Sequence, residues 1–249
     1  SCRKAPDALA AGPWSPQEVQ GFLDTLQHRT FLYFWELGDT TRGLTPDRAP
    51  THSFVSTGAM GFALTAYPIG AEHGWVSRES ARARTLATLR FLWTAPQDSS
   101  ATATGYRGFY YHFLDPASGR RFERVELSTM DTALLLGGVL FCQSYFDRAG
   151  PDERAVRELA DSIVRRVDWQ WAQPRPPVIA LGWSPEHGHL PYDWRGYNET
   201  MLLHVLALGS PSHPVGPETW HAWTSGYRWG SFDGQEHLGF APLFGHQYS

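Results

Sequence analysis

Residues 126–140 read ELSTMDTALLLGGVL, with two carboxylates, Glu126 and Asp131, in front of a long apolar run. Ser128-x-x-Asp131 matches a capping box with an acidic residue at the third helical position, so a helix is expected to begin there. The residues that follow are apolar nearly all the way round, and a helix without a polar face belongs in the interior of a protein. This stretch therefore predicts a buried helix with negative charge at its N-terminal end.

The rest of the chain alternates two kinds of predicted helix. Amphipathic segments, with apolar residues at helical spacing, are each followed by a segment that is apolar nearly all round. In the first amphipathic segment Phe22, Leu26 and Phe34 form one stripe, which we expect to face the core. The amphipathic segments are residues 16–36, 77–93 and 152–171, and the apolar ones are residues 54–67, 128–146 and 197–208.

This alternation predicts an all-α fold, an (α/α)6 toroid in which outer and inner helices alternate around a ring. Three helix pairs make half of a six-pair ring, so we expect only about half of the toroid in this chain. A helical solenoid is the nearest alternative, but no repeated motif supports it.

The predicted domain organisation is an N-terminal tail or linker, residues 1–15, followed by one toroid domain, residues 16–249, expected to be C-terminally incomplete. Residues 105–125 contain a DPASG turn among aromatic residues and predict a β-hairpin over the cleft end of the ring. Two long loops, residues 172–196 and 210–249, are rich in Pro, Gly, Trp and His. Loops of this length in a compact domain are usually functional.

The composition excludes several classes of protein. A net charge of −4 over 249 residues gives no reason to expect a nucleic-acid partner. The apolar runs are too short, or too broken by glycine, to form a transmembrane segment. Cys142, within an apolar helix, is expected to be a buried free thiol. Cys2 fits a lipidated cysteine that would anchor the chain to a membrane, and a chance N-terminal cysteine is the alternative.

Neither a cofactor nor a metal is predicted. The chain has no GxSxG elbow, no GxxxxGK[ST] phosphate loop and no GxGxxG turn. His187-Gly188-His189 with Asp193 could bind a metal ion, but HEXXH and paired CxxC motifs are absent.

Three carboxylates are the candidate catalytic residues. Glu199 stands at the start of the third apolar segment, as Glu126 and Asp131 do for the second. If outer helices carry the chain back each time, every inner helix begins at the same mouth of the ring and these side chains converge. Such a group suits glycoside hydrolysis, in which one acid protonates the leaving oxygen and a second carboxylate is the nucleophile or activates water. The alternatives are structural: Asp131 as a helix cap, Glu126 paired with Arg121 or Arg124, and Glu199 stabilising a helix dipole.

Aromatic residues make up 14% of the chain, and many lie in predicted loops. Aromatic rings present flat apolar faces that stack on the C–H surfaces of sugars. The candidates for stacking are Trp35, Tyr111, Trp183, Trp194 and Trp229, with core packing as the alternative for each.

Six long motifs occur in order between about Phe22 and the last residue: FWELGDTTRGLTPDR, GFALTAYPIGAEHGWVSRE, GFYYHFLDPASGRR, ELSTMDTALLLGGVL, YNETMLLHVLALGSPSHP and PLFGHQYS. Together they resemble the bacterial glucoamylase-like domain family. That family has an (α/α)6 toroid fold and is similar to endo-β-1,2-glucanases and to the transglycosylating domain of cyclic β-1,2-glucan synthases. Its members continue past HQYS through several more helices, from which an inverting base would come.

The resemblance implies roles for individual residues. Glu199, in the YNE motif, looks like the general acid, while Glu126 and Asp131 would line the cleft beside the scissile bond. Glu126 would be the nucleophile if the enzyme retains configuration, as the synthase-related branch does. The residues expected to contact sugar are Asp47 and Arg48 of LTPDR, Tyr111 and His112 of YYHF, and Trp194, Tyr197 and Asn198 beside Glu199.

The sequence therefore predicts a glycoside hydrolase or transglycosylase acting on an oligo- or polysaccharide β-glucan, with β-1,2-glucan favoured by the resemblance alone. Such a protein is expected in the periplasm or secreted, and lipid-anchored if Cys2 is modified. One alternative is a non-catalytic carbohydrate-binding α/α toroid. Another is a sugar isomerase or epimerase that acts through histidines such as His112 and His246.

Overall fold

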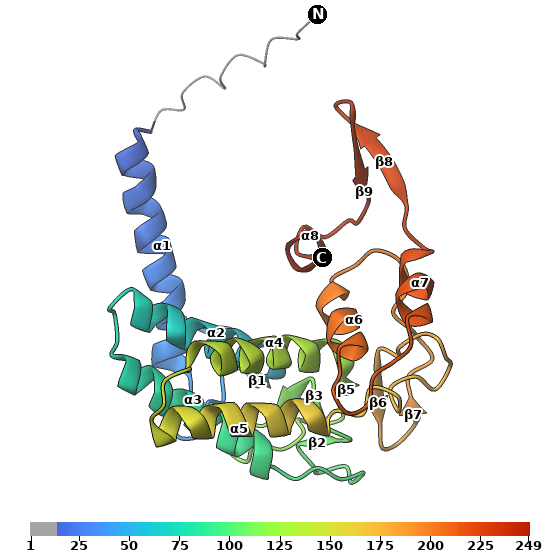
Figure 1. Ribbon diagram of the computed structural model, residues 1–249, viewed down its shortest axis with the longest axis horizontal. Helices are drawn as coiled ribbons and strands as arrows, with labels where there is room; N and C mark the ends of the chain where they lie inside the picture. The colour runs from blue at the N-terminus through green and yellow to red at the C-terminus, as the bar shows by residue number, and fades with distance from the viewer. Residues whose placement is uncertain (1–13) are drawn as a thin grey trace, which may run out of the picture.

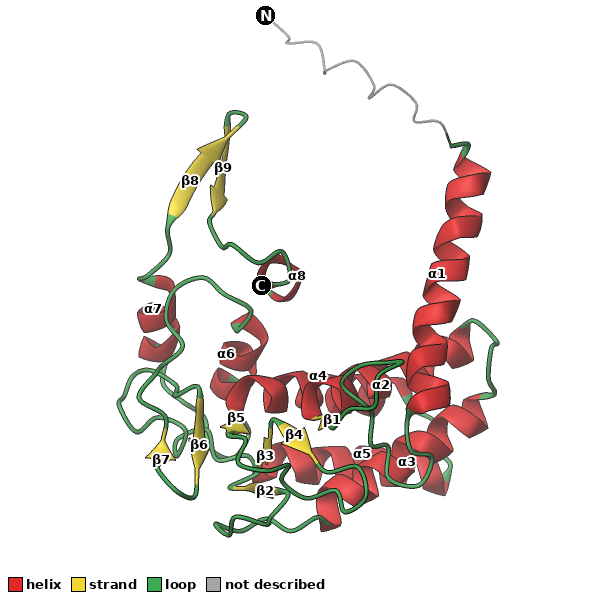
Figure 2. Ribbon diagram, turned by 180° about the vertical axis from the view of Figure 1, so that it is seen from behind, coloured by secondary structure: helices red, strands yellow, loops and turns green. Residues whose placement is uncertain are grey.

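The computed structural model describes residues 14–249. Its helices are α1 (Pro16–Leu37), α2 (Thr57–Glu72), α3 (Arg78–Thr94), α4 (Thr129–Tyr145), α5 (Pro151–Arg166), α6 (Met201–Leu208), α7 (Glu218–Thr224) and α8 (Gly245–Tyr248). Its strands are β1 (Val55–Ser56), β2 (Gly105–Tyr106), β3 (Phe109–Tyr111), β4 (Phe113–Leu114), β5 (Leu127–Ser128), β6 (Gly182–Ser184), β7 (Gly188–His189), β8 (Trp229–Phe232) and β9 (Gln235–Leu238). Figures 1 and 2 show the helices α2 to α5 packed at the base of the molecule, with α1 and the β8–β9 hairpin rising from opposite sides.

The centre of the fold is the pair α2 and α4, which pack on each other more extensively than any other two elements. Glycine makes this approach possible: a Cβ added to Gly138 would lie 2.1 Å from the carbonyl oxygen of Gly61, and one added to Gly61 would lie 2.3 Å from that of Leu134. Both helices are apolar nearly all round, which is the character expected of interior helices. The prediction of buried helices at these two segments is confirmed.

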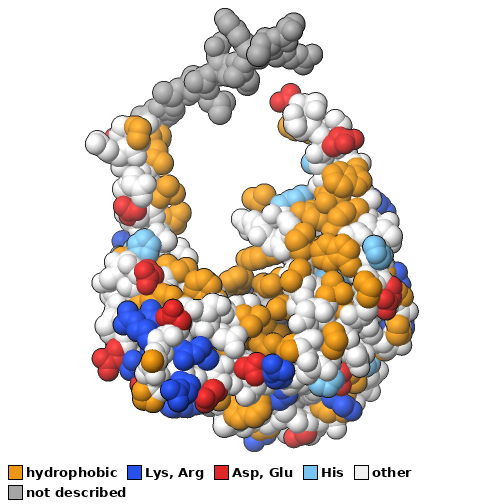
Figure 3. All heavy atoms as spheres, in the orientation of Figure 1, with side chains coloured by type: hydrophobic (Ala, Val, Ile, Leu, Met, Phe, Trp, Pro, Cys, Tyr) orange, Lys and Arg blue, Asp and Glu red, His pale blue; other side chains and the backbone are white. Residues whose placement is uncertain are grey.

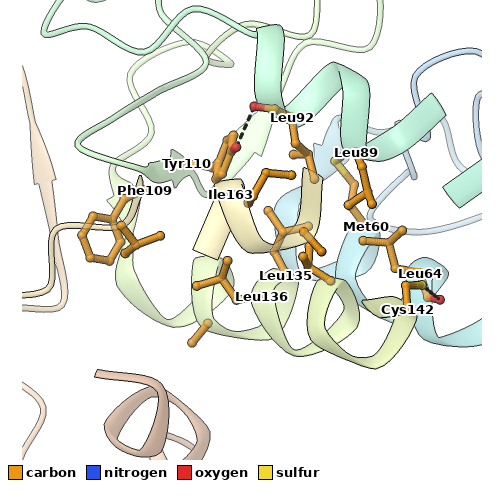
Figure 4. Close-up of a cluster of buried hydrophobic side chains, with 14 of the residues drawn as sticks. Met60, Leu64, Leu89, Leu92, Phe109, Tyr110, Leu135, Leu136, Cys142 and Ile163 are labelled. Atoms are coloured by element: carbon orange, nitrogen blue, oxygen red, sulfur yellow. Dashed lines mark hydrogen bonds between the residues drawn. The ribbon is translucent and has the colours of Figure 1, made fainter. Parts of the chain in front are cut away.

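The amphipathic helices α3 and α5 lie side by side and cover α2 and α4 (Figure 1). Figure 4 shows the apolar side chains that fill the space between these layers, among them Leu89, Leu135 and Ile163. Charged contacts join α3 and α5 at the edge: Arg78 donates to both carboxylate oxygens of Glu153, at 2.8 and 3.0 Å, and Arg82 pairs with Asp152 at 3.0 Å.

The starts of α2, α4 and α6 recur at a constant interval, and α2 and α4 share the same side-chain cap. The N-caps of α2, α4 and α6 are Ser56, Ser128 and Thr200, each 72 residues after the one before. Ser56 and Ser128 have almost the same backbone angles, φ −100°, ψ 127° and φ −99°, ψ 125°, and each side chain accepts the N–H three residues later. Each is also the second residue of a two-residue strand, β1 or β5, so both helices enter the core in the same way.

The fold is mostly helical but not all-α, which corrects the predicted class. A five-stranded antiparallel sheet has the order β2-β3-β5-β6-β7, and two-stranded sheets join β1 to β4 and β8 to β9. The predicted hairpin at residues 105–125 was wrong in detail. Its turn is at Arg107-Gly108, between β2 and β3, and β4 turns away to pair with β1.

Two helix boundaries differ from the prediction because polar side chains hold local turns. The segment predicted to run to residue 171 ends at Arg166, and the Asp168 carboxylate just beyond it accepts the N–H of Trp171. The segment predicted from residue 197 begins at Met201, because Asn198 Oδ1 accepts both the N–H and the hydroxyl of Thr200. Such side-chain bonds compete with the helical pattern.

The first helix is the clearest departure from expectation. Phe22 and Leu26 were expected to face the core, but they are 60% and 51% exposed, and within α1 only Phe31 is buried. The N-terminal half of α1 extends away from the body in Figures 1 and 2. Figure 3 shows apolar side chains along the inner side of α1 and across the floor of the hollow between α1 and the β8–β9 hairpin.

Both cysteines were the subject of a prediction. Cys142 is a buried free thiol, as expected, and its Sγ donates to the carbonyl oxygen of Leu64 at 3.0 Å. Cys2 lies outside the described residues. No helix within residues 14–249 combines the length and the apolarity needed to cross a bilayer.

Candidate active site

A pocket of about 310 Å³ is lined by residues from the N-terminal end of α4, the segment before α6 and the α8 segment. Its polar lining consists of His112, Glu126, Ser128, Asp131 and Glu199, and its apolar lining of Met130, Leu134, Leu181, Leu190, Trp194, Phe244 and Tyr248. Neither lysine nor arginine is among these lining residues, so His112 is the one side chain of the lining that can carry positive charge.

Strand register places His112 beside Glu126. In the β3–β5 pair Tyr111 lies opposite Leu127, and the next backbone bond runs from the N–H of His112 to the carbonyl of Glu126, at 2.9 Å. Cross-strand neighbours of this kind bring their side chains together on one face of a sheet. The side chains meet in a hydrogen bond of 2.7 Å between His112 Nδ1 and Glu126 Oε1.

His112 also lies at the point where the chain passes from one helix entrance to the other. Its carbonyl oxygen accepts the N–H of Thr57, the first residue of α2, at 3.1 Å. Its Nε2 lies 3.4 Å from Oδ2 of Asp131, in the first turn of α4. The imidazole is therefore held between the N-terminal ends of the two central helices.

Asp131 is both a capping residue and a pocket residue. Its backbone N–H donates to Ser128 Oγ at 3.1 Å, and the Ser128 hydroxyl donates back to Asp131 Oδ2 at 2.6 Å. The other oxygen, Oδ1, lies beside Gly58 of α2, where a Cβ would come within 2.8 Å of it. Helix capping was the structural alternative to a cleft role for Asp131. The cap in fact fixes the carboxylate of Asp131 at the pocket wall.

The surroundings separate the acidities of the two carboxyls. Burial alone would raise the pKa of Glu126, but the hydrogen bond to His112 and the charges of His112 and Arg121 outweigh it, so the pKa lies below its usual value. Burial dominates at Asp131 and raises its pKa, although His112 and the Ser128 hydroxyl partly oppose this. Glu126 is thus the group that stays ionised as the pH falls.

Glu199 joins the same pocket from a turn before α6 rather than from the helix itself. Its neighbour Asn198 is buried and is used structurally, because its Oδ1 also accepts the indole N–H of Trp223 at 3.3 Å. The structure therefore brings together the three predicted carboxyl groups, Glu126, Asp131 and Glu199.

Trp194 is the one predicted stacking residue that lines this pocket. Its indole N–H donates to Thr129 Oγ1 at 2.9 Å, which fixes the orientation of the ring. Tyr111 is fully buried and Trp229, on β8, is 66% exposed, so neither is part of the lining. Trp35 packs under the guanidinium of Arg84, and Trp183 packs among Tyr106 and Trp171.

Four other residues predicted to contact sugar lie outside the lining. Tyr197 packs against Tyr227 and His246, and Asn198 is buried as described above. Arg48 is exposed and pairs with Asp47 at 3.4 Å. Asp47 also lies outside the lining, although its charge is among those that raise the pKa of His112 against the opposing effect of burial.

The structural alternatives for several residues are decided by their partners. Arg121 is bound to Glu186, at 2.7 and 3.0 Å, and Glu126 is bonded to His112, so the structural alternative of a pair between Glu126 and Arg121 does not hold. Asp193 is bound by Arg175 at 2.6 Å, which removes it from a site with the two histidines of HGH. Across residues 14–249 no group of three or more His, Cys, Asp or Glu side chains is arranged to hold a metal ion.

The apolar lining was largely missed by sequence reasoning. Leu181 and Leu190 lie near β6 and β7 in a long loop, where nothing in the local pattern distinguishes them from core residues. Phe244 and Tyr248 stand in the PLFGHQYS motif, whose aromatic residues were the available signal. Gly58, next to Asp131, carries no sequence signal beyond its place in the first turn of an apolar helix.

Comparison with known proteins relates the chain to carbohydrate-active enzymes. Residues 191–249 match the protein family described as "Putative glucoamylase". Over 220 residues the chain is 27% identical to an exo β-1,2-glucooligosaccharide sophorohydrolase (non-reducing end) from Parabacteroides distasonis, a match that covers 84% of this chain and 29% of that protein.

Solved structures show the same fold. A crystal structure titled as that of a "putative glucoamylase" from Bacteroides caccae superposes with a TM-score of 0.80 and 30% identity, over 92% of this chain and 59% of that one. A β-1,2-glucanase from Parabacteroides distasonis superposes with a TM-score of 0.74 and 26% identity, over 87% of this chain and 31% of that one. The chain thus spans less than two thirds of the length of these relatives. It is related in sequence and in fold to the glucoamylase-like proteins, and the resemblance predicted from its motifs is confirmed.

Proposed function

We propose that the protein is a glycoside hydrolase or transglycosylase that acts on β-1,2-glucan by carboxylate acid/base chemistry. The observation that carries the proposal is the convergence of Glu126, Asp131 and Glu199 in one pocket that also contains Trp194. Glycosidases use a pair of carboxyl groups on either side of the scissile bond. The substrate comes from the names of the relatives, a β-1,2-glucooligosaccharide hydrolase and a β-1,2-glucanase.

The proposed roles follow from the acidities and the resemblance together. Glu199 is the general acid that protonates the glycosidic oxygen. Glu126, whose pKa is held below its usual value, is ionised at neutral pH and suits a nucleophile. Asp131, whose pKa is raised by burial, lines the cleft beside the scissile bond.

Substrate contacts are proposed both inside the pocket and beyond it. Trp194 presents its fixed ring to the pocket and is the proposed stacking surface for a glucose unit. Asp47, Arg48 and Tyr197 are proposed to meet sugar units beyond the pocket. Asn198 and Tyr111, both buried, would act only by supporting Glu199 and the β3–β5 pair.

We also propose that the described helices form part of an (α/α)6 toroid, with α2, α4 and α6 as inner helices. Their N-caps recur at a constant interval, and α4 contacts both α2 and α6. The exposed stripe of α1 that includes Phe22 and Leu26 is then the place where a further helix of the ring packs. A structure of the whole protein that leaves this stripe facing solvent would contradict the toroid.

The substitution Glu199→Gln tests the function. It should abolish release of glucooligosaccharides from β-1,2-glucan while binding, followed by calorimetry, is kept, because the amide cannot donate the catalytic proton. Glu158→Gln, on the exposed face of α5, is the control and should leave both unchanged. If the unsubstituted protein binds β-1,2-glucan and never cleaves it, the protein is instead a carbohydrate-binding toroid.

We also propose a periplasmic or secreted location for the protein, with a lipid anchor at Cys2, the second residue of the sequence. Fractionation of cells that express the protein, with and without Cys2→Ser, tests this location. Recovery in the cytoplasmic fraction would contradict it.

A further inference from the structure

The proposed function does not account for the protonation state of the cluster formed by His112, Glu126 and Asp131. We infer that His112 is doubly protonated in the resting protein and acts as a positioning residue, an imidazolium that holds Glu126 and Asp131 at fixed places in the pocket. The inference deepens the proposed function, on which the kinetic part of its test depends.

The direction of each hydrogen bond follows from the helix cap. Ser128 Oγ accepts the backbone N–H of Asp131, so the single hydroxyl proton of Ser128 is free to point to Asp131 Oδ2, 2.6 Å away. Oδ2 is therefore an acceptor. A lone pair on His112 Nε2 would be repelled by this oxygen at 3.4 Å, and Nε2 must carry a proton.

The second ring nitrogen leads to the same conclusion. Nδ1 lies 2.7 Å from Glu126 Oε1, and such a short contact between a nitrogen and a carboxylate is typical of a charge-assisted hydrogen bond. A neutral imidazole has one donor and one acceptor, whereas both nitrogens of an imidazolium are donors. Two carboxylate acceptors, one at each nitrogen, are thus matched by the charged form alone.

The surrounding charges agree with this assignment. Every ionisable group that lines the pocket besides His112 and Tyr248 is a carboxyl group, and Asp47 adds a further negative charge nearby. Burial alone would lower the pKa of His112, but the bond to Glu126 and the charges of Asp131, Glu126 and Asp47 outweigh it and raise the pKa. Should Asp131 also bind a proton, Oδ1 beside Gly58 is the oxygen left for it, since Oδ2 already serves two donors.

Positioning and sugar contact are different roles for His112. Nδ1 is bonded to Glu126 and Nε2 lies 3.4 Å from Asp131, so a carboxyl oxygen competes with any sugar hydroxyl at each ring nitrogen. One ring face is also covered, because Phe113 stacks on it with centroids 3.9 Å apart. The side chain is about a third exposed, so it lines the pocket while its two nitrogens already face carboxyl groups.

Nitrogen-15 NMR of histidine-labelled protein tests the protonation state directly. His112 should show two proton-bearing ring nitrogens at pH 7 and a titration midpoint above the ordinary histidine value of about 6.5. His204 is the internal control: it is buried, its Nδ1 contacts the Thr200 carbonyl at 2.8 Å, and burial lowers its pKa, so it should stay neutral with one proton-bearing nitrogen. The substitution Glu126→Gln should move the His112 midpoint down. A midpoint at or below the ordinary histidine value of about 6.5 would overturn the inference.

Steady-state kinetics of His112→Gln provide the second measurement. A positioning role predicts a fall in kcat of about 10²-fold, the cost of misplaced catalytic groups, with little change in KM for β-1,2-glucooligosaccharides. A raised KM with kcat kept would show a sugar contact instead and overturn the positioning role. If the unsubstituted protein cleaves no β-glucan, the proposed function fails, while the NMR result still decides the state of His112.

Discussion

Gly58 offers the sharpest test of the way the pocket is built, because the substitution Gly58→Ala adds a single carbon atom beside Asp131. The new Cβ would lie 2.8 Å from Asp131 Oδ1 and 3.4 Å from Leu134 Cδ1. Ordinary contact begins at 3.4 Å. The carboxylate must therefore retreat by about 0.6 Å, since the packed helix backbones on either side cannot easily give way.

That retreat has a calculable effect on the cluster. Applied along the two contacts of Oδ2, it lengthens the 2.6 Å bond from Ser128 to about 3.2 Å, which weakens it, and the 3.4 Å contact with His112 to about 4.0 Å, where the contact is effectively lost. Loss of one such bond costs about 1 kcal/mol, and replacing a helical glycine by alanine gains about 1 kcal/mol, so the free energy of unfolding should hardly change. Activity should nevertheless fall by about 10- to 100-fold, because a catalytic cluster is sensitive to displacements of this size.

The assay pairs urea unfolding with initial rates on β-1,2-glucooligosaccharides. Gly21→Ala is the matched control: it lies in exposed α1 with no atom within 4 Å of the added Cβ, and it should stabilise the protein by about 1 kcal/mol with no loss of rate. If Gly58→Ala keeps full activity, Asp131 tolerates displacement and the account of the cluster given above is wrong.

Three further outcomes are expected. Glu153→Gln should lower the free energy of unfolding at pH 7 by about 1–3 kcal/mol, because it removes the charged partner of Arg78 from a side chain that is only 4% exposed. The bond from Arg78 lowers the pKa of Glu153, so this stabilisation is complete above the usual range of a carboxyl group and is lost as the pH falls through the lowered pKa. Urea unfolding of parent and variant at a series of pH values should therefore converge in acid. In pH–rate profiles the acid limb should move to higher pH in His112→Gln, since His112 opposes the effect of burial and holds the pKa of Glu126 down; an unmoved limb would assign it to another group. Finally, burial raises the pKa of the Cys142 thiol to about 12, so the number of thiols that react with a chromogenic disulfide should rise by one when the protein is unfolded in urea.

Local pattern was enough to predict the scaffold around the site. The all-round apolar runs, the Ser128-x-x-Asp131 cap and the order of the segments identified the inner helices α2 and α4 and the place of the carboxylates. These features depend on residues only a few positions apart in the sequence, because a helix cap and a helix face are each formed by residues close together in the chain.

What could not be predicted depends on pairing across the chain. Residues 109–114 lie between the two helix entrances because β3 pairs with β5 and β4 with β1, and no local signal encodes that choice. It is this pairing that carries His112 to Glu126. The exposed stripe of α1 could not be placed for a similar reason. Periodicity predicts that Phe22 and Leu26 pack against an apolar surface, but it does not say which surface that is.

The matched N-caps of α2 and α4 make two positions of the scaffold equivalent. Two residues ahead of each cap stand Phe54 and Glu126, and three residues after it stand Ala59 and Asp131. The backbone therefore presents the same two positions at both helix starts, and only at the start of α4 are both occupied by acidic residues. The acidic pair can therefore be moved from the start of α4 to the start of α2 by exchanging side chains at equal offsets, while the helices that carry them remain unaltered.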